Sequence, residues 1–291
     1  MKKVFIAILF CLSLIAFAQK TDRKLEAKLK ETISDFNGDI GIYVKNLRTG
    51  KTASINADTI FPTASIVKVP ILLGVMDKIN KVELKYDSTL TYKDSLLYEG
   101  EDILGSFKND EKILLKKMLL LMLSTSDNTA SLWLQNIAGT GTRINEILDS
   151  LGLKSTRVNS RTPGREDNRT QYGWGQTTPA EMGTIFEKIY RNEIFSATAC
   201  ERMMRCLGRN YWDEDEAISQ IPPTIEVFSK NGCVNASRSE VLLVNAPHNP
   251  YIFCIFTKNN KDQQWTHENE AWVMARKISA MLWEYFELKK K

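Results

Sequence analysis

Residues 61–72 read FPTASIVKVPIL and place a serine and a lysine at the start of an apolar helix. Apolar residues recur at every fourth position as far as Ile79, so the spacing predicts a helix from residue 66 to about 79. Ser65 and Lys68 are then one helical turn apart. A serine hydroxyl is a poor nucleophile until a neighbour accepts its proton, and a lysine with a depressed pKa can do so. The free N–H groups of a first turn also favour a developing oxyanion.

Two further triplets support a nucleophilic serine. Ser126-Asp127-Asn128 falls in a polar turn between two helical runs, and Lys230-Asn231-Gly232 ends a predicted strand. Taken singly, the first triplet is ordinary helix-capping chemistry and the second is ordinary hairpin chemistry. Because SxxK, SDN and KxG each occur once, in this order and on suitable elements, the combination indicates a catalytic site.

The N-terminus is typical of an export signal. Lys2 and Lys3 precede an apolar run over residues 4–17, and Ala16-Phe17-Ala18 fits a signal-peptidase site. The alternative is an uncleaved membrane anchor, for which the apolar run is short. We therefore expect residues 1–18 to be removed and the protein to be exported, either to the periplasm or as a secreted protein.

Composition argues against several classes of partner. The chain has 39 Lys and Arg and 35 Asp and Glu; subtracting Lys2 and Lys3 leaves a net charge of +2 for the mature protein. This balance gives no reason to expect nucleic acid or a membrane as a partner. Without a CxxC pair and with only two histidines, we expect no metal site and no cofactor. We expect a monomer with free thiols at Cys200, Cys206, Cys233 and Cys254.

The order of predicted elements separates the ends of the chain from its middle. A first helix ending near Asn37-Gly38 precedes strand-like runs at 39–47 and 51–57, and a helix at 268–286 closes the chain. Three more strand-like runs lie at 224–230, 239–246 and 251–257, with a turn expected at Asn231-Gly232. The middle carries helical runs at 111–123, 129–137, 142–151, 179–191 and 197–207, interrupted by a loop at 152–178.

These elements predict an α/β fold of the α+β type. An antiparallel sheet made from residues 19–62 and 208–291 would be flanked by the terminal helices, and residues 63–207 would form an all-helical second domain. The long loop at 152–178 is a candidate for function, since loops of this length in compact domains are usually functional or disordered.

The three motifs resemble those of the penicillin-recognising serine hydrolases, most closely the class A serine β-lactamases. The likeness extends to FPTASIVKVPIL, LLLMLSTSDNTASLWL and TTPAEM, and covers nearly the whole mature chain. It implies a β-lactamase/transpeptidase-like fold with the site in the cleft between the two domains. The implied partner is a small molecule, either a β-lactam or an acyl-D-Ala-like substrate.

The resemblance also implies catalytic roles. Ser65 would attack the lactam carbonyl and Lys68 would accept or relay its proton. Ser126 would pass a proton to the departing nitrogen, and Lys230 would hold the substrate carboxylate. The backbone N–H groups of Ser65 and Cys233 would form the oxyanion hole.

Other positions are implied to bind substrate. Asn128 would hydrogen-bond the substrate amide. Asn231, where the family generally has threonine or serine, can still donate a hydrogen bond from its amide beside Gly232. Arg238, expected on the next strand, is either a second contact to the substrate carboxylate or a plain surface arginine.

Two departures from the family pattern bear on activity. Ungapped matching puts Thr162 where these β-lactamases carry the glutamate that activates the deacylating water, and threonine cannot act as that base. Glu166 and Asp167 follow closely; they are either substitutes for this glutamate or solvated loop carboxylates. Ala64 excludes the disulfide found beside the nucleophile in some carbapenem-hydrolysing relatives.

The sequence leaves three hypotheses for function. The first is an exported serine β-lactamase of the class A type that opens β-lactam rings through a Ser65 acyl-enzyme. The second is a penicillin-binding protein, or a D-alanyl-peptidase or esterase. The third is a binder of β-lactams or peptidoglycan fragments that is acylated without efficient release. The missing base at Thr162 favours the third.

Overall fold

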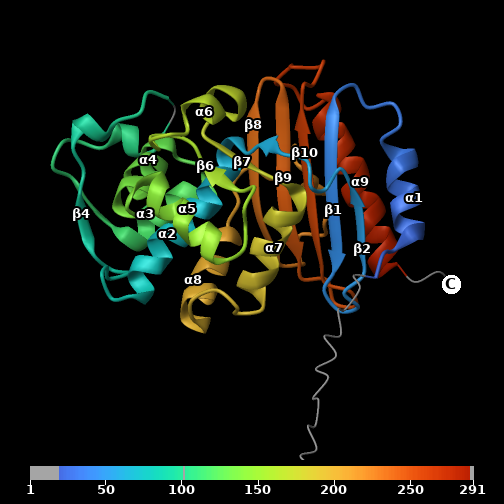
Figure 1. The fold of residues 1–291 in the computed structure, drawn as a ribbon, viewed down its shortest axis with the longest axis horizontal. Coiled ribbons are helices and arrows are strands. Elements are labelled where there is room, and N and C mark those ends of the chain that lie inside the picture. The colour runs from blue at the N-terminus through green and yellow to red at the C-terminus, as the bar shows by residue number, and fades with distance from the viewer. Residues whose placement is uncertain (1–19, 101, 289–291) are drawn as a thin grey trace, which may run out of the picture.

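The computed structural model describes residues 20–100 and 102–288. Its largest sheet has five antiparallel strands in the order β2-β1-β10-β9-β8, so both ends of the chain build it, as predicted (Figure 1). The predicted fold class is confirmed. The strands of this sheet are β1 (Asp39–Asn46), β2 (Thr52–Ile55), β8 (Val227–Val234), β9 (Ser237–Val244) and β10 (Tyr251–Lys258).

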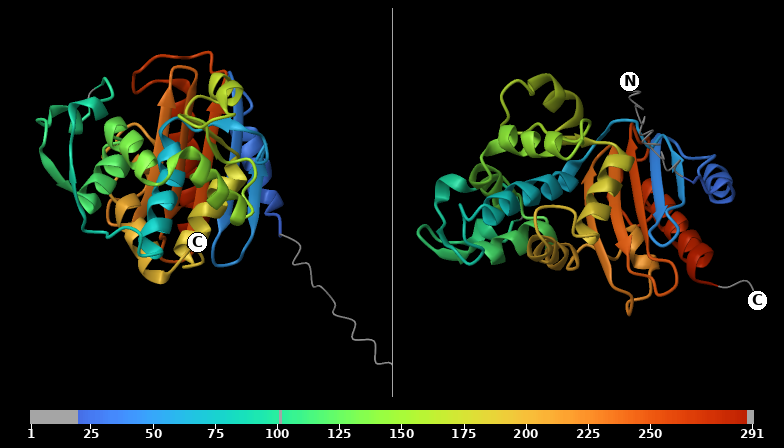
Figure 2. Two further views of the ribbon diagram at one scale, coloured as in Figure 1. Left: turned by 60° about the vertical axis from the view of Figure 1, so that its left-hand side comes forward. Right: turned by 60° about the horizontal axis from the view of Figure 1, so that its bottom comes forward.

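The terminal helices α1 (Arg23–Thr32) and α9 (Glu270–Glu287) cover one face of the sheet (Figures 1 and 2). Leu25 and Leu29 pack in the same buried cluster as the inward apolar residues of the strands and of α9, because a step of four keeps them on one helix face. Helix α1 ends earlier than predicted. The chain turns after Ile33, and the backbone N–H of Asn37 donates to Glu270 at 3.0 Å.

Helix α7 (Pro179–Tyr190) packs on the opposite face of the sheet, between the sheet and the other helices (Figure 2). A Cβ on Gly183 would lie 2.6 Å from the Tyr43 ring, so glycine is what allows α7 to approach β1 this closely. Although α7 falls within residues 63–207, its buried face contacts the sheet. The two halves of the molecule therefore share one core.

The remaining helices surround α2 (Lys68–Asn80), which is buried from Lys68 to Asp77. They bury their apolar faces in the large cluster that also reaches the sheet. The helices are α3 (Leu115–Ser124), α4 (Asn128–Ile137), α5 (Thr140–Ser150) and α8 (Ala197–Leu207), with short 3₁₀ turns η1 (Ala64–Val67), η2 (Asp94–Leu96), η3 (Leu104–Ser106) and η4 (Ala217–Gln220).

The loop predicted at 152–178 contains regular structure. Helix α6 (Glu166–Tyr172) buries none of its seven residues, so it has no apolar periodicity to reveal it. Five short strands were also missed, because strands of two or three residues have no alternation to detect. They are β3 (Phe61–Pro62), β6 (Arg157–Val158) and β7 (Gly175–Thr177) in a small sheet, and β4 (Thr89–Thr91) with β5 (Lys112–Leu114) in a hairpin.

The turn expected at Asn231-Gly232 was wrong. Strand β8 continues through both residues to Val234 and pairs with β9 throughout, so the chain reverses at Asn235-Ala236 instead. The polar residues Lys230 and Asn231 are buried inside a continuous edge strand.

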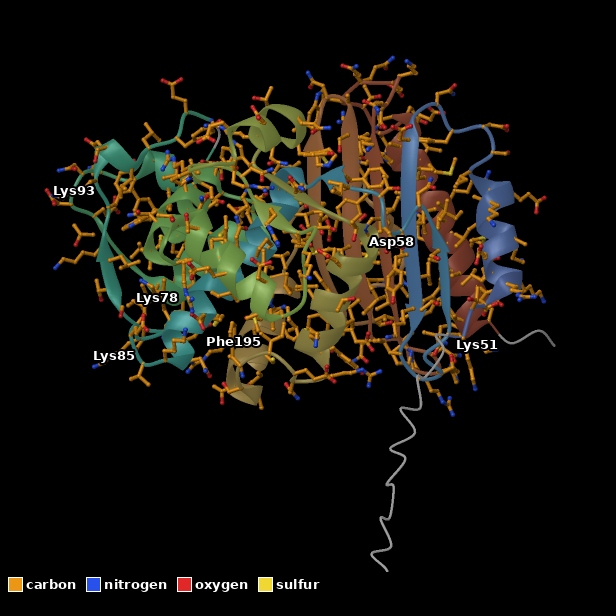
Figure 3. The ribbon with its side chains drawn as sticks, in the orientation of Figure 1. Lys51, Asp58, Lys78, Lys85, Lys93 and Phe195 are labelled. Atoms are coloured by element: carbon orange, nitrogen blue, oxygen red, sulfur yellow. The ribbon has the colours of Figure 1, made fainter. Side chains whose placement is uncertain are left out.

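Charged side chains are spread over the surface. Lys51, Lys78, Lys85 and Lys93 lie at separate places along the ribbon, from the sheet to the far side of the helical half (Figure 3). Within the described ranges no helix combines the length and the apolar character needed to cross a membrane. The four cysteines there are free, and of these only Cys233 is partly exposed. The predicted export signal lies outside the described residues.

Candidate active site

Ser65 and Lys68 meet where a 3₁₀ turn becomes helix α2. Ala64, with φ of 43°, turns the chain from β3 into η1, and Lys68 is the first residue of α2. Lys68 is 1% exposed, and its Nζ lies 3.1 Å from the Ser65 hydroxyl oxygen. The structure therefore brings the two residues of the first motif into hydrogen-bonding contact.

The second motif joins the same nitrogen. Lys68 Nζ donates to Ser126 Oγ at 2.9 Å and to Asn128 Oδ1 at 2.8 Å, and also contacts the Ser126 carbonyl oxygen. Ser126 has a φ of 64°, a conformation that is uncommon for residues other than glycine and often found at functional sites. Asp127 caps α4 by accepting from Ala130 N at 2.7 Å, which fixes the turn.

Burial depresses the basicity of Lys68. Desolvation is the largest cause that lowers its pKa well below the usual value, and the positive charge of Lys230 lowers it further. Asp102 and Asp127 oppose this shift but do not reverse it. A lysine in this environment has access to the neutral form that a general base needs.

Lys230, from the third motif, is fully buried on β8, the edge strand. Its Nζ donates to the Asn231 carbonyl at 2.8 Å and to Asn231 Oδ1 at 3.1 Å. Burial lowers its pKa to about 8, although the acidic groups Glu216 and Glu240 favour the charged form. Lys230 therefore supplies a positive charge beside Lys68 below about pH 8.

Gly232 brings β8 against the nucleophile turn. A Cβ at this position would lie 2.3 Å from the Thr63 carbonyl oxygen and 2.9 Å from the Ser65 nitrogen. Only glycine allows this backbone approach. Cys233, the next residue, and Ser65 line the same two cavities. The oxyanion hole assigned to their backbone N–H groups remains a prediction that this juxtaposition supports.

Two cavities meet at Ser65. One, of about 580 Å³, has Tyr98 and Trp174 on its wall, and the other, of about 830 Å³, reaches Ser126 and Asn231; Asn128 and Cys233 line both. Both volumes are in the range of small-molecule sites. Residues from all three motifs therefore converge on one cleft, with the serine hydroxyl at the junction of its two parts.

Arg238 does not line either cavity. It is 2% exposed, and its guanidinium donates to the carbonyls of Val234, Asn235, Ser237 and Gln264. The guanidinium carbon also lies 4.2 Å from the Trp265 ring centre and 4.9 Å from that of Trp272. These contacts connect the β8–β9 turn to the loop before α9. Arg238 is therefore neither a surface arginine nor a residue on the wall of the cleft, the two positions that the sequence left open.

Neither Thr162 nor the acidic residues after it line the cavities at Ser65. The Thr162 hydroxyl donates to the Ser160 carbonyl at 2.9 Å, and the side chain packs so closely on α5 that a Cβ on Gly141 would lie 1.8 Å from it. Glu166 and Asp167 are exposed at the start of α6 and line neither cavity at Ser65.

Sequence reasoning missed two buried carboxylates behind the third motif. Glu216 is 5% exposed and accepts from Asn231 Nδ2 at 2.9 Å, while Glu240 is 1% exposed and lies directly across from Asn231 on β9. The one available signal was Glu240 itself, a carboxylate directly before the apolar run VLLV of the same predicted strand. Nothing in the sequence marks Glu216.

The fold and the convergent motifs define a class A β-lactamase-like serine hydrolase. A family model described as "Beta-lactamase enzyme family" matches residues 24–286, and the chain belongs to this family. The chain is 22% identical over 298 residues to β-lactamase VEB-1 of Pseudomonas aeruginosa, with 98% of each chain covered. It is 25% identical over 291 residues to an imipenem-hydrolysing β-lactamase of Enterobacter cloacae, covering 96% and 97%.

Solved structures show the same fold. PBP-A superposes with a TM-score of 0.81 at 21% identity, covering 92% of this chain and 98% of PBP-A. A variant of that protein has been solved as its acyl-enzyme complex with penicillin G. This likeness confirms the predicted β-lactamase/transpeptidase-like architecture.

Proposed function

We propose that the protein opens β-lactam rings through an acyl-enzyme on Ser65 and releases the acyl group slowly. The observation that carries the proposal is the 3.1 Å contact between Ser65 Oγ and the buried Lys68 amine. The export-signal pattern of residues 1–18 supports export of the protein. The enzyme acts as a monomer, and its substrate is a small β-lactam.

Acylation follows from the cleft as described. Neutral Lys68 accepts the Ser65 proton as Ser65 Oγ attacks the lactam carbonyl. The carbon–nitrogen bond of the ring breaks, and Ser126 gives its hydroxyl proton to the departing nitrogen. Ser126 takes the proton that came from Ser65 back from Lys68, whose Nζ donates to Ser126 Oγ at 2.9 Å. The N–H groups of Ser65 and Cys233 stabilise the oxyanion, a contribution of about 3 kcal/mol per donor.

Substrate binding uses the cavity wall formed by the second and third motifs. Lys230 is buried behind this wall and lines neither cavity, so its positive charge attracts the substrate carboxylate from behind Asn231, to which its Nζ donates. Asn128 hydrogen-bonds the side-chain amide. Asn231 has one N–H committed to Glu216, so one N–H is left for the substrate.

Slow release follows from the loop. Hydrolysis of the ester needs a base that activates water, and the family carries this base on the loop around α6. No Asp or Glu lines the smaller cavity beside α6. The carboxylates that line the larger cavity come from other segments: Asp102, Asp213, Glu214, Asp215 and Glu216. Thr162 contacts Ser160 and α5 instead, as described above. This favours a long-lived adduct, a behaviour that a penicillin-binding protein or a β-lactam binder without efficient release would share.

Intact-mass spectrometry after incubation with penicillin G tests the proposal. We expect one adduct of the mass of the antibiotic that persists for many minutes. Ser65→Ala should show no adduct, and Ser95→Ala, which changes an exposed serine, should form the adduct as the wild type does. An adduct of undiminished yield on Ser65→Ala would refute the assignment of the nucleophile. Turnover of a chromogenic cephalosporin without any detectable adduct would refute slow release.

A further inference from the structure

One buried carboxylate contacts two side chains of β8, on either side of Gly232. Asn231 Nδ2 donates to Glu216 Oε1 at 2.9 Å, and the Cys233 thiol lies 3.6 Å from the same oxygen. Glu216 immediately precedes η4 and is 5% exposed. It lies on the wall of the larger cavity at Ser65, and its carboxylate contacts the strand that carries the third motif.

Glu216 determines which way the Asn231 amide faces. The amide oxygen of Asn231 accepts from Lys230 Nζ at 3.1 Å while its NH₂ group donates to Glu216. A reversed amide would point its NH₂ group at the Lys230 ammonium and its oxygen at the carboxylate, and both contacts would be repulsive. The Glu216 carboxylate thus fixes the Asn231 amide, and the amide oxygen in turn fixes the position of the Lys230 ammonium.

Glu240 holds the segment that carries Glu216. It lies opposite Asn231 across the β8–β9 pair, and its carboxylate accepts from the backbone N–H groups of Ala217 at 2.6 Å and Ile218 at 3.3 Å. These are the two residues that follow Glu216, so its backbone cannot move away from β8 without breaking buried hydrogen bonds.

Several charges face this carboxylate. Burial raises the pKa of both Glu216 and Glu240, and the neighbouring carboxyl raises that of Glu240 further. The other groups that face Glu216 are Asp215 next to it in the chain, Lys230 and Cys233 on β8, and Arg238 on β9. The only ammonium among these groups is that of Lys230. Any change of charge at Glu216 is therefore felt at Lys230 and at the Cys233 thiol.

We propose that Glu216 is a positioning residue that acts through Asn231 to hold the Lys230 ammonium for the substrate carboxylate. This rests on the proposed function, because the substrate is the one named there. It explains why an asparagine serves in this chain next to Lys230: its amide spans the gap between the carboxylate and the ammonium.

A double-mutant cycle tests the connection. Glu216→Ala and Asn231→Ala should each slow acylation by penicillin G about tenfold through weaker binding, and the double variant should be no slower than Asn231→Ala. Glu216→Gln, which keeps an acceptor oxygen, should recover most of the rate. Glu268→Ala, an exposed carboxylate outside both cavities, serves as the matched control. Losses that simply multiply in the double variant would overturn the proposal.

A second measurement needs no β-lactam activity. Glu216 raises the pKa of the Cys233 thiol, an effect smaller than that of burial. Removing the charge with Glu216→Gln should lower this pKa and increase the rate of reaction with a chromogenic disulfide reagent at pH 8 severalfold. Cys233→Ser measures the background from other thiols. Equal rates in the wild type and Glu216→Gln would overturn the contact. If thiol reactivity changes but no β-lactam acylates the wild type, the proposed function fails and the contact stands.

Discussion

The Nζ atom of Lys68 and the Oγ atom of Ser65 lie 3.1 Å apart at the meeting point of two cavities. The lysine is almost completely buried, and burial lowers its pKa. A hydroxyl and an amine of lowered pKa at this separation form the nucleophile and base of an acyl-transfer site.

Lys68→Arg should therefore abolish the base while keeping a positive charge. Arginine is not deprotonated in proteins, so we expect the acylation rate to fall by about 10²–10⁴-fold. Stopped-flow measurement with a chromogenic cephalosporin checks this, with Lys85→Arg, an exposed lysine that lines neither cavity, as a control. A rate within tenfold of the wild type would show that another group takes the Ser65 proton.

The second prediction concerns pH. Burial lowers the pKa of Lys230 to about 8 against the opposing carboxylates of Glu216 and Glu240. Lys230 is positive below that pH and neutral above it, so attraction for an anionic substrate should be lost as pH rises through about 8. The second-order rate constant for acylation, measured from pH 5 to 10, should therefore fall above about pH 8. In Lys230→Arg the descending limb should move to much higher pH; an unmoved limb would assign it to another group.

The exposed loop acids should not affect the lifetime of the adduct. Because Glu166 and Asp167 line neither cavity at Ser65, Glu166→Gln and Asp167→Asn should leave the half-life of the penicillin adduct unchanged within about twofold. Mass spectra taken over a time course give this half-life. A tenfold longer adduct in either variant would identify that residue as the deacylation base.

Arg238→Ala should affect stability more than binding. Its guanidinium donates to four backbone carbonyls and stacks on Trp265 and Trp272, so the free energy of unfolding should fall by roughly 2 kcal/mol. Urea denaturation measures the loss. The apparent affinity for penicillin should change less than threefold. An unchanged unfolding midpoint together with a tenfold weaker affinity would show that Arg238 contacts the substrate after all.

Much of the fold could be predicted because the strands and helices that build it bury long apolar faces. The closing run YIFCIFT is a continuous apolar stretch typical of a buried strand, and the apolar residues of α2 repeat every four positions, so local sequence reveals both. Helix α6 could not be predicted in this way, because it buries no residue. The continuation of β8 through Asn231-Gly232 also depends on a distant partner, the backbone at Thr63 and Ser65.

The site residues also differ in whether local sequence could indicate them. The three motifs indicated Ser65, Lys68 and Ser126 because each lies at the start of an element or in a turn with its own local pattern. Glu216 acts only across space, fifteen residues before Asn231, and no local pattern marks it. The use of Arg238 also depends on Trp265 and Trp272, which come from a segment far along the chain.

The contact of Gly232 with the Thr63 carbonyl has a consequence for how ligands enter. The sheet and the helical half touch there through main-chain atoms, at a separation that leaves no room for a side chain. A clamshell motion of the two halves would pull this contact apart and separate Ser65 from β8. Admission of a ligand must therefore depend on rearrangement of side chains at the rim, such as the Tyr98 and Trp174 rings with centres 5.2 Å apart, while the floor of the site stays rigid.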